Sequence, residues 1–193
     1  MKIKNQFQVP LPLEEAWVIL NDIPRVAHCA PGAELVEAQE NGDYVGIVRV
    51  KLGPVALSFK GTLSYKERDA DARRVVAEAS GAEERARGSA RANVVFNLSA
   101  IDEKLTRVNV DTDVQLAGSI AQYGRGTALM QSTAQVLMNQ FAKNFAASFG
   151  AGADPDAVNR KAAPVSALSL TGKALVGLAK SKFERSETRG SKQ

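Results

Sequence analysis

The stretch PLPLEEAWVILNDIPRVAHCAPGAEL, residues Pro10–Leu35, decides the fold that this sequence predicts. Pro12 can open a helix, because a proline loses no hydrogen bond at the first helical position. Pro24 ends that helix, and a second short helix is predicted over Arg25–Cys29. The pair Pro31-Gly32 then predicts a turn into a strand. The sequence therefore places two short helices directly after an N-terminal strand.

A long series of strands follows this segment. Between Tyr44 and Leu116, five stretches alternate apolar and polar residues with a period of two, as strands with one buried face do. Residues such as Lys60, Arg91 and Asp111 fall on the opposite, water-facing side. These stretches predict one antiparallel sheet with a single dry face.

A long amphipathic helix is predicted to cover that dry face. No proline or glycine occurs between Thr127 and Phe149, and apolar residues recur there at three- and four-residue steps. At 1.5 Å per residue this helix would be roughly 35 Å long and could lie diagonally across the whole sheet. A curved antiparallel sheet wrapped around a long C-terminal helix, with two short N-terminal helices, is an α+β fold of the helix-grip kind.

The charge is distributed unevenly along the chain. Residues 1–149 carry 17 Lys and Arg against 17 Asp and Glu, whereas residues 150–193 carry 8 against 4. We expect one domain over residues 1–149, a polar linker over residues 150–163 and a basic, partly amphipathic tail over residues 164–193. The predicted domain has no basic excess and the tail has no interleaved aromatic residues, so nucleic acid is not an expected partner.

The tail allows three interpretations. Its candidate membrane or partner contacts share one helical side or flank it: Val165, Leu168, Lys173, Leu175, Val176, Lys180, Lys182 and Phe183. The stretch is too short and too charged to span a bilayer, but it suits the surface of a membrane with anionic lipids. Docking on a partner protein and a disordered tail without a role remain open. The N-terminal residues predict a strand instead of a signal peptide, which favours a cytoplasmic protein. If the tail is a membrane contact, the protein would associate peripherally with the cytoplasmic membrane.

Residues that could carry catalysis or hold a metal are nearly absent. His28 and Cys29 are the only histidine and the only cysteine, and as neighbours in a helix they should point about 100° apart. They are too few for a zinc or iron site. Asp102-Glu103 predicts a hairpin turn, and Glu83-Glu84-Arg85 predicts a solvated strand end. We therefore expect no catalytic residue, no metal and no covalently bound cofactor.

A cavity between helix and sheet is the candidate site, because a long helix cannot touch a strongly curved sheet everywhere. Small residues such as Gly61, Ala77, Ala90, Ala92 and Ala134 would leave room in it. Trp17 and Tyr123 could present an N–H and an O–H to a ligand carbonyl. The predicted wall consists of Trp17, Leu20, Val26, Val50, Phe59, Phe96, Val114, Tyr123, Met130, Leu137 and Met138.

Two motifs carry a family resemblance. PLEEAWVILNDIPRVAHCAPGAELVE at Pro12–Glu37 and GSIAQYGRGTALMQSTAQVLMNQFAKNF at Gly118–Phe145 resemble the family of the carbon monoxide dehydrogenase G subunit, within the START-like (SRPBCC, polyketide cyclase/Bet v 1-like) superfamily. The resemblance covers about residues 1–149. It implies the helix-grip fold with a hydrophobic cavity, and a role beside molybdenum hydroxylases of the carbon monoxide dehydrogenase type.

The resemblance also implies a function. It is that of a non-catalytic accessory protein that binds an isoprenoid quinone or similar lipid and brings the enzyme or its electron acceptor to the membrane. Partners would then be a hydrophobic small molecule, the hydroxylase subunits and the inner-membrane surface. An assembly or membrane-docking protein without a ligand is one alternative. A polyketide cyclase-like enzyme is the other, but such an enzyme would present several Arg, His or Asp side chains inside its cavity.

Overall fold

An antiparallel sheet is the main element of the computed structural model, which describes residues 1–52, 55–125 and 127–150. Within those residues it has seven strands in the order β1-β7-β6-β5-β4-β3-β2. The strands are β1 (Lys2–Val9), β2 (Ala33–Ala38), β3 (Tyr44–Leu52), β4 (Val55–Asp69), β5 (Arg74–Glu83), β6 (Gly88–Asp102) and β7 (Leu105–Gly118). Strands β3 to β7 confirm the five alternating stretches. The predicted hairpin turn at Asp102-Glu103 is present between β6 and β7: its turn residues are Glu103 and Lys104, and the Lys104 N–H donates to Oδ1 of Asp102, the last residue of β6, at 2.8 Å.

The two short N-terminal helices are present. They are α1 (Leu13–Leu20) and α2 (Ile23–Val26), and the short 3-10 helix η1 (Ala27–Cys29) continues α2. The second helix begins two residues earlier than predicted, because Asp22 caps it by accepting a hydrogen bond from the Arg25 N–H at 3.2 Å. Pro24 lies in the first turn, where a missing N–H costs nothing. It therefore helps to start α2.

A turn at Gly32 connects these helices to the sheet, as the sequence predicts. Gly32 has φ +75°, a conformation that side chains with a Cβ disfavour. A Cβ there would also lie 2.2 Å from the Arg49 carbonyl oxygen of β3. Both the positive φ and the close contact require glycine at this position. The tight turn that Gly32 makes possible places η1 next to the start of β2.

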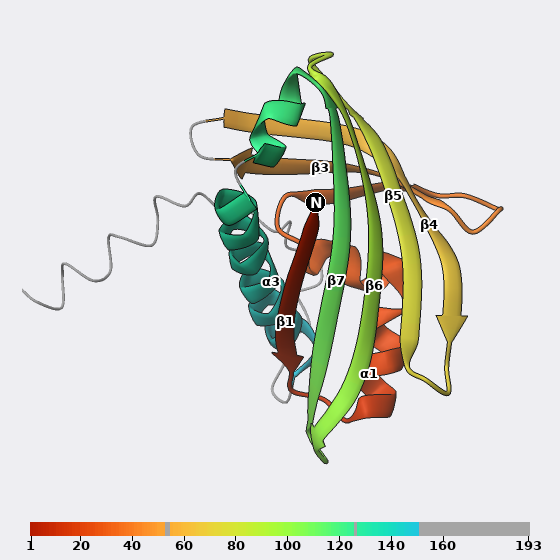
Figure 1. Ribbon diagram of the computed structural model, residues 1–193. Helices are drawn as coiled ribbons and strands as arrows, with labels where there is room; N and C mark the ends of the chain where they lie inside the picture. The colour runs from red at the N-terminus through yellow and green to blue at the C-terminus, as the bar shows by residue number, and fades with distance from the viewer. Residues whose placement is uncertain (53–54, 126, 151–193) are drawn as a thin grey trace, which may run out of the picture.

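The C-terminal helix α3 (Thr127–Phe149) has the predicted bounds, and the 3-10 helix η2 (Ser119–Arg125) leads into it. Its position differs from the prediction. Instead of crossing the whole sheet diagonally, α3 follows β1 at one edge (Figure 1). Gln131 Nε2 donates to the Lys4 carbonyl at 2.7 Å, and Asn5 Nδ2 donates to Gln135 Oε1 at 2.9 Å. These bonds hold the helix against β1 and leave the middle of the curved sheet less covered.

Two separate apolar clusters connect the helices to the inner face of the sheet. One joins α1, α2 and the C-terminal half of α3, with Phe145 fully buried and Phe141 packed edge-on against Phe7 at 5.4 Å between ring centroids. The other joins Leu52, Leu57 and Ile120 near η2. Because the clusters lie toward opposite ends of α3, the space between them is the place where a cavity can form.

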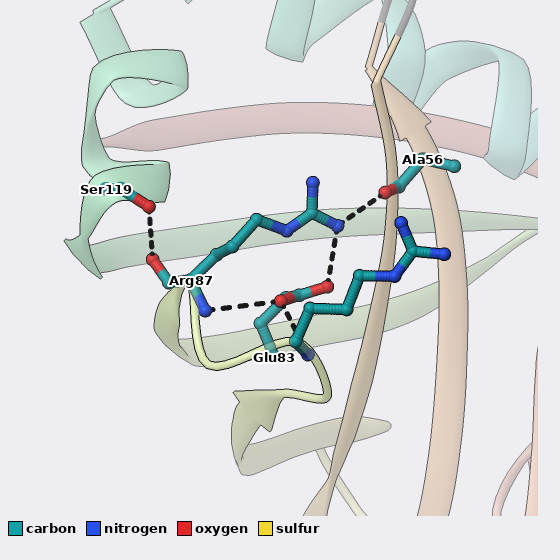
Figure 2. A network of polar contacts seen from close by, with 5 residues as sticks. Ala56, Glu83, Arg87 and Ser119 are labelled. Carbon is teal, nitrogen blue, oxygen red and sulfur yellow. Dashed lines mark hydrogen bonds and ion pairs between the residues drawn. The ribbon is translucent and has the colours of Figure 1, made fainter.

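A buried polar network closes the turn between β5 and β6 (Figure 2). Glu83 is 3% exposed, so the predicted solvated strand end is wrong for this residue. Its carboxylate accepts hydrogen bonds from Arg87 Nη2 at 2.8 Å and from the Arg85 N–H at 2.9 Å. The Arg87 bond, with help from backbone N–H donors and against the opposing effect of burial, lowers the pKa of Glu83 to about 2.

The same network fixes neighbouring elements. Arg87 Nη2 also donates to the Ala56 carbonyl of β4 at 2.8 Å, and Ser119 Oγ of η2 donates to the Arg87 carbonyl at 2.8 Å. The Ile120 N–H donates to that carbonyl too, at 3.2 Å. The ion pair therefore joins β4, the β5–β6 turn and η2, and so positions the entry into α3.

Candidate functional site

A cavity of about 490 Å³ lies between the inner face of the sheet and the helices. The sheet contributes its floor, Ile23 and Val26 of α2 contribute from one end, and Met138 and Phe141 of α3 contribute from above. This volume is within the range of small-molecule sites, which is about 300–1,000 Å³. The cavity lies in the space between the two apolar clusters, with Phe59 touching both the cavity and the cluster near η2.

The cavity is hollow because small residues lie in register across its floor. Gly46, Gly61, Gly81 and Ala90 face one another on β3, β4, β5 and β6, and all four line the cavity. The neighbouring row contributes Ala79 opposite Ala92. Apart from the methyl groups of the alanines, nothing rises from this part of the floor into the space below α3.

Gly61 is required by the sheet itself. A Cβ at this position would lie 2.1 Å from the Ser80 carbonyl oxygen and 2.6 Å from the Gly81 Cα. The backbones of β4 and β5 therefore approach too closely for any larger residue. Such glycines mark tight bends in sheets, and the curvature that they permit contributes to the cavity.

Five of the eleven residues predicted for the cavity wall line it: Leu20, Val26, Phe59, Phe96 and Met138. The other six lie outside the lining. Val50, Tyr123 and Met130 pack on the cluster near η2, and Trp17 packs on the cluster around α1. Val114 of β7 and Leu137 of α3 are half-buried elsewhere. Four of the six therefore pack in the apolar clusters instead of facing the cavity.

Trp17 and Tyr123 were the predicted polar groups of the cavity, and neither lies there. Trp17 instead has the Arg73 guanidinium 5.6 Å from its ring centroid, a cation–π distance. Tyr123 closes the end of the core near η2. The lining includes residues that the sequence did not single out, among them Tyr44, Phe7 and Phe141. Their strand alternation or helix spacing put them on the dry face, but only the packing shows that they reach the cavity.

The lining is almost entirely apolar. Among the described residues it contains one charged side chain, Glu34, which forms an ion pair with Arg49 at 3.0 Å. No described Arg, Lys, His or Asp lines the cavity. Val48 lines the cavity and is 48% exposed, so the space reaches the surface beside β3. A ligand held here would be bound by apolar contact and could enter along β3.

His28 and Cys29 lie outside the cavity lining, against the C-terminal turn of α3. His28 Nε2 lies 3.1 Å from Ser148 Oγ and 3.4 Å from Cys29 Sγ. The expectation that the two side chains point apart is therefore wrong, because their sulfur and nitrogen atoms are in contact. Both residues also contact α3, where Asn144 Nδ2 donates to the Cys29 carbonyl at 2.9 Å.

This contact does not make a nucleophile. Burial raises the pKa of the Cys29 thiol to about 11, against the opposing hydrogen bond from Ser148. Burial also lowers the pKa of His28. A protonated, fully buried thiol is inert. Across the described parts of the chain, no group of three or more His, Cys, Asp or Glu side chains could hold a metal ion.

The comparison with protein families gives a match over residues 6–150 to CoxG, the G subunit of carbon monoxide dehydrogenase. The chain belongs to this family. The comparison with curated proteins gives no significant match. The resemblance stated from the two motifs is thus confirmed, and the START-like helix-grip fold is confirmed with it.

Solved structures with the same fold are distant in sequence. A conserved protein from Geobacillus kaustophilus is 17% identical with a TM-score of 0.65, covering 77% of this chain and 97% of its own. The Zhui aromatase/cyclase from Streptomyces sp. R1128 is 12% identical with a TM-score of 0.56, covering 79% and 97%. A protein from Thermus thermophilus is 15% identical with a TM-score of 0.56, covering 77% and 99%. At these low sequence identities, the similarity shows a shared fold and nothing about function.

Family membership and this fold around an apolar cavity support a ligand-binding accessory role. Within the described residues, no helix is both long and apolar enough to cross a bilayer. The predicted tail contacts, from Val165 to Phe183, lie outside the described residues, as does the predicted linker apart from Gly150.

Proposed function

We propose that this protein is a non-catalytic carrier that holds a flat, water-insoluble molecule in the cavity below α3. The observation that supports this most strongly is the composition of the cavity: about 490 Å³ with an apolar lining and an opening beside β3. A chain that needed only a stable core would fill that space, because protein interiors are packed as densely as organic crystals. Here the facing row of Gly46, Gly61, Gly81 and Ala90 keeps the space open.

An isoprenoid quinone is the ligand that we propose, with a similar lipid as the wider class. The ring is flat and apolar on both faces, and the isoprene chain is flexible. Burying a few hundred Å² of such a molecule would stabilise the complex by roughly 5–10 kcal/mol before the costs of association. The costs of association reduce the net binding free energy below this value, so the ligand can also be released, as a carrier requires.

The partner that we propose is a molybdenum hydroxylase of the carbon monoxide dehydrogenase type. The family's own description, which makes its members the G subunit of carbon monoxide dehydrogenase, supports this. Co-purification of the tagged chain with the hydroxylase subunits tests the partnership directly.

The basic tail, with a net charge of +4 over residues 150–193, would attach the domain to the anionic surface of the inner membrane.

The cavity lining argues against a cyclase-like enzyme. General acid–base work on a reactive chain needs positioned titratable groups, and within the described residues the lining offers Glu34, engaged by Arg49, and Tyr44. A ligand-free docking protein is the remaining alternative. It predicts that the cavity has no occupant in the cell.

Solvent extraction of the purified protein, followed by mass spectrometry, tests the carrier proposal. Protein expressed in a quinone-producing host should yield quinone or lipid in a constant ratio to protein. Ala79→Leu should remove that yield, because Ala79 lines the cavity floor. Ala82→Leu on the same strand should not, because Ala82 is exposed on the other face. Wild-type protein that is repeatedly free of quinone and lipid would contradict the proposal and favour the docking protein.

A further inference from the structure

Tyr44 is the one polar residue of the described cavity lining that stands at an inward-facing strand position. The lining has four residues with polar side chains, which are Glu34, Tyr44, Thr62 and Ser80. Thr62 and Ser80 pair with each other across β4 and β5, one position away from the inward pair Gly61 and Gly81. Since successive side chains of a strand point to opposite faces, both hydroxyls belong to the outer face.

Glu34 is also excluded as the polar group of the cavity interior. It pairs with Ile47, whereas the adjacent inward pair is Ala33 with Val48. Its carboxylate points to the outer face, where Arg49 Nη1 donates to it at 3.0 Å. Tyr44 differs from these three, because it pairs with Leu63, which faces inward opposite Ala79.

The Tyr44 ring is held in place by a second tyrosine. Its centroid lies 6.1 Å from that of Tyr65, with the two rings at 88°. The Tyr65 hydroxyl in turn lies 3.5 Å from the Asn21 carbonyl oxygen at the end of α1. Edge-to-face packing of this kind is favourable and fixes ring orientation. Tyr44 therefore lines the cavity on a ring that a second aromatic side chain supports, and Leu20 and Ile23 of the N-terminal helices line the same cavity.

Asn21, whose carbonyl the Tyr65 hydroxyl contacts, carries another polar atom without a partner, but it lies outside the cavity lining. Asn21 Nδ2 donates to the Trp17 carbonyl at 2.8 Å, but Asn21 Oδ1 is buried and accepts no hydrogen bond from the described residues. The Tyr44 hydroxyl likewise has no hydrogen bond to any described residue, while the Tyr65 hydroxyl reaches the Asn21 backbone. An unpaired tyrosine hydroxyl in an otherwise apolar cavity can define the orientation of a ligand that has one polar end.

We propose that Tyr44 is the residue that sets ligand orientation and selectivity: its O–H donates a hydrogen bond to an oxygen of the ligand, whose polar end lies toward the junction of α1 and α2. This rests on the proposed function, since it assumes that the cavity holds a ligand. It adds that the ligand class is apolar molecules with a carbonyl or similar oxygen acceptor on the ring, and that pure hydrocarbons of equal shape bind less tightly.

The test compares two probes of nearly the same shape, 2-methyl-1,4-naphthoquinone and 2-methylnaphthalene, by equilibrium titration of the delipidated full chain. Wild-type protein should bind both and prefer the quinone. Tyr44→Phe should weaken quinone binding about three- to tenfold, the effect of one lost hydrogen bond, and leave hydrocarbon binding unchanged. Tyr65→Phe is the matched control. It removes a hydroxyl from the supporting ring, which does not line the cavity, and should change neither affinity.

The outcomes separate this proposal from the function on which it rests. If Tyr44→Phe weakens both probes equally or neither probe, the hydroxyl does not select the ligand and the Tyr44 proposal is wrong, while the carrier proposal stands. If wild-type protein binds neither probe, the carrier proposal is contradicted, and the role of Tyr44 with it. Unfolding curves of the variants establish that each is folded at the titration temperature.

Discussion

At the scale of single residues, a buried ion pair connects three elements at one end of the sheet. Glu83 and Arg87 join the β5–β6 turn to β4 and η2, and the hydrogen bonds at Glu83 lower the pKa of its carboxyl group. The composition of Glu83-Glu84-Arg85, which is that of an exposed turn, hides this burial in the sequence. Strand parity was the available signal: Glu83 pairs with the inward-facing Phe59.

Acid should destabilise the domain through Glu83. The pKa is about 2 in the folded chain and 4.5 ordinarily, so the carboxylate stabilises the fold fully above about pH 4.5 and loses this effect as the pH falls toward 2. Glu83→Gln should lower the free energy of unfolding at neutral pH, and its difference from wild type should shrink by about pH 3. Urea unfolding at both pH values measures this, with Glu84→Gln on the exposed neighbour as the control. A difference that stays constant with pH would contradict the assignment.

The Cys29 thiol should react very slowly with alkylating reagents in the folded chain. Its thiol is fully buried and its pKa is raised to about 11, so almost none of it is thiolate at about pH 8. Alkylation by iodoacetamide, followed by intact-mass measurement, should be far slower in native protein than in urea-unfolded protein. Equal rates in the two states would show that η1 opens readily from α3.

At the scale of elements, the sequence predicts the parts better than their placement. The bounds of α3 are predictable because no proline or glycine interrupts Thr127–Phe149. The dry face of the sheet is predictable because apolar and polar residues alternate along most of each long strand. The residues of the cavity wall are only partly predictable, since they depend on which inward-facing residues of neighbouring strands lie opposite one another. That register depends on features such as the irregularity between Tyr65 and Glu67, which the alternation pattern does not specify.

Trp17 and Phe59 test this distinction between wall and core. Trp17→Ala should lower the free energy of unfolding by about 2 kcal/mol through lost packing around α1, and leave ligand affinity unchanged, because Trp17 lies outside the cavity lining. Phe59→Ala should lower both stability and affinity, because Phe59 lines the cavity. Chemical unfolding and quinone titration below both unfolding temperatures measure the two effects separately. A loss of affinity in Trp17→Ala equal to that in Phe59→Ala would place the ligand elsewhere.

At the scale of the whole molecule, we propose a division of labour between the domain and the basic segment that follows it. The domain that matches the family ends near Gly150, where the described residues also end. All of the excess positive charge lies in residues 150–193. The proposed carrier therefore has its ligand site in a neutral domain and its membrane contact in a cationic extension.

Deletion of residues 151–193 tests this division. The full chain should float with anionic liposomes, and the shortened chain should not, because the apolar and lysine side chains of the tail are lost. Both should bind quinone with equal affinity in the absence of liposomes. The control is flotation with zwitterionic liposomes, which neither chain should join strongly. Unchanged flotation of the shortened chain would rule out the tail as the membrane contact.

The central claim is that the cavity below α3 is an apolar site that binds a flat ligand. Isothermal titration of delipidated protein with a short-chain ubiquinone, repeated at several temperatures, tests it most directly. The account predicts one ligand per chain, a negative heat-capacity change from apolar burial, and loss of binding in Ala79→Leu but not in Ala82→Leu. No binding, or binding that Ala79→Leu leaves intact, would contradict it.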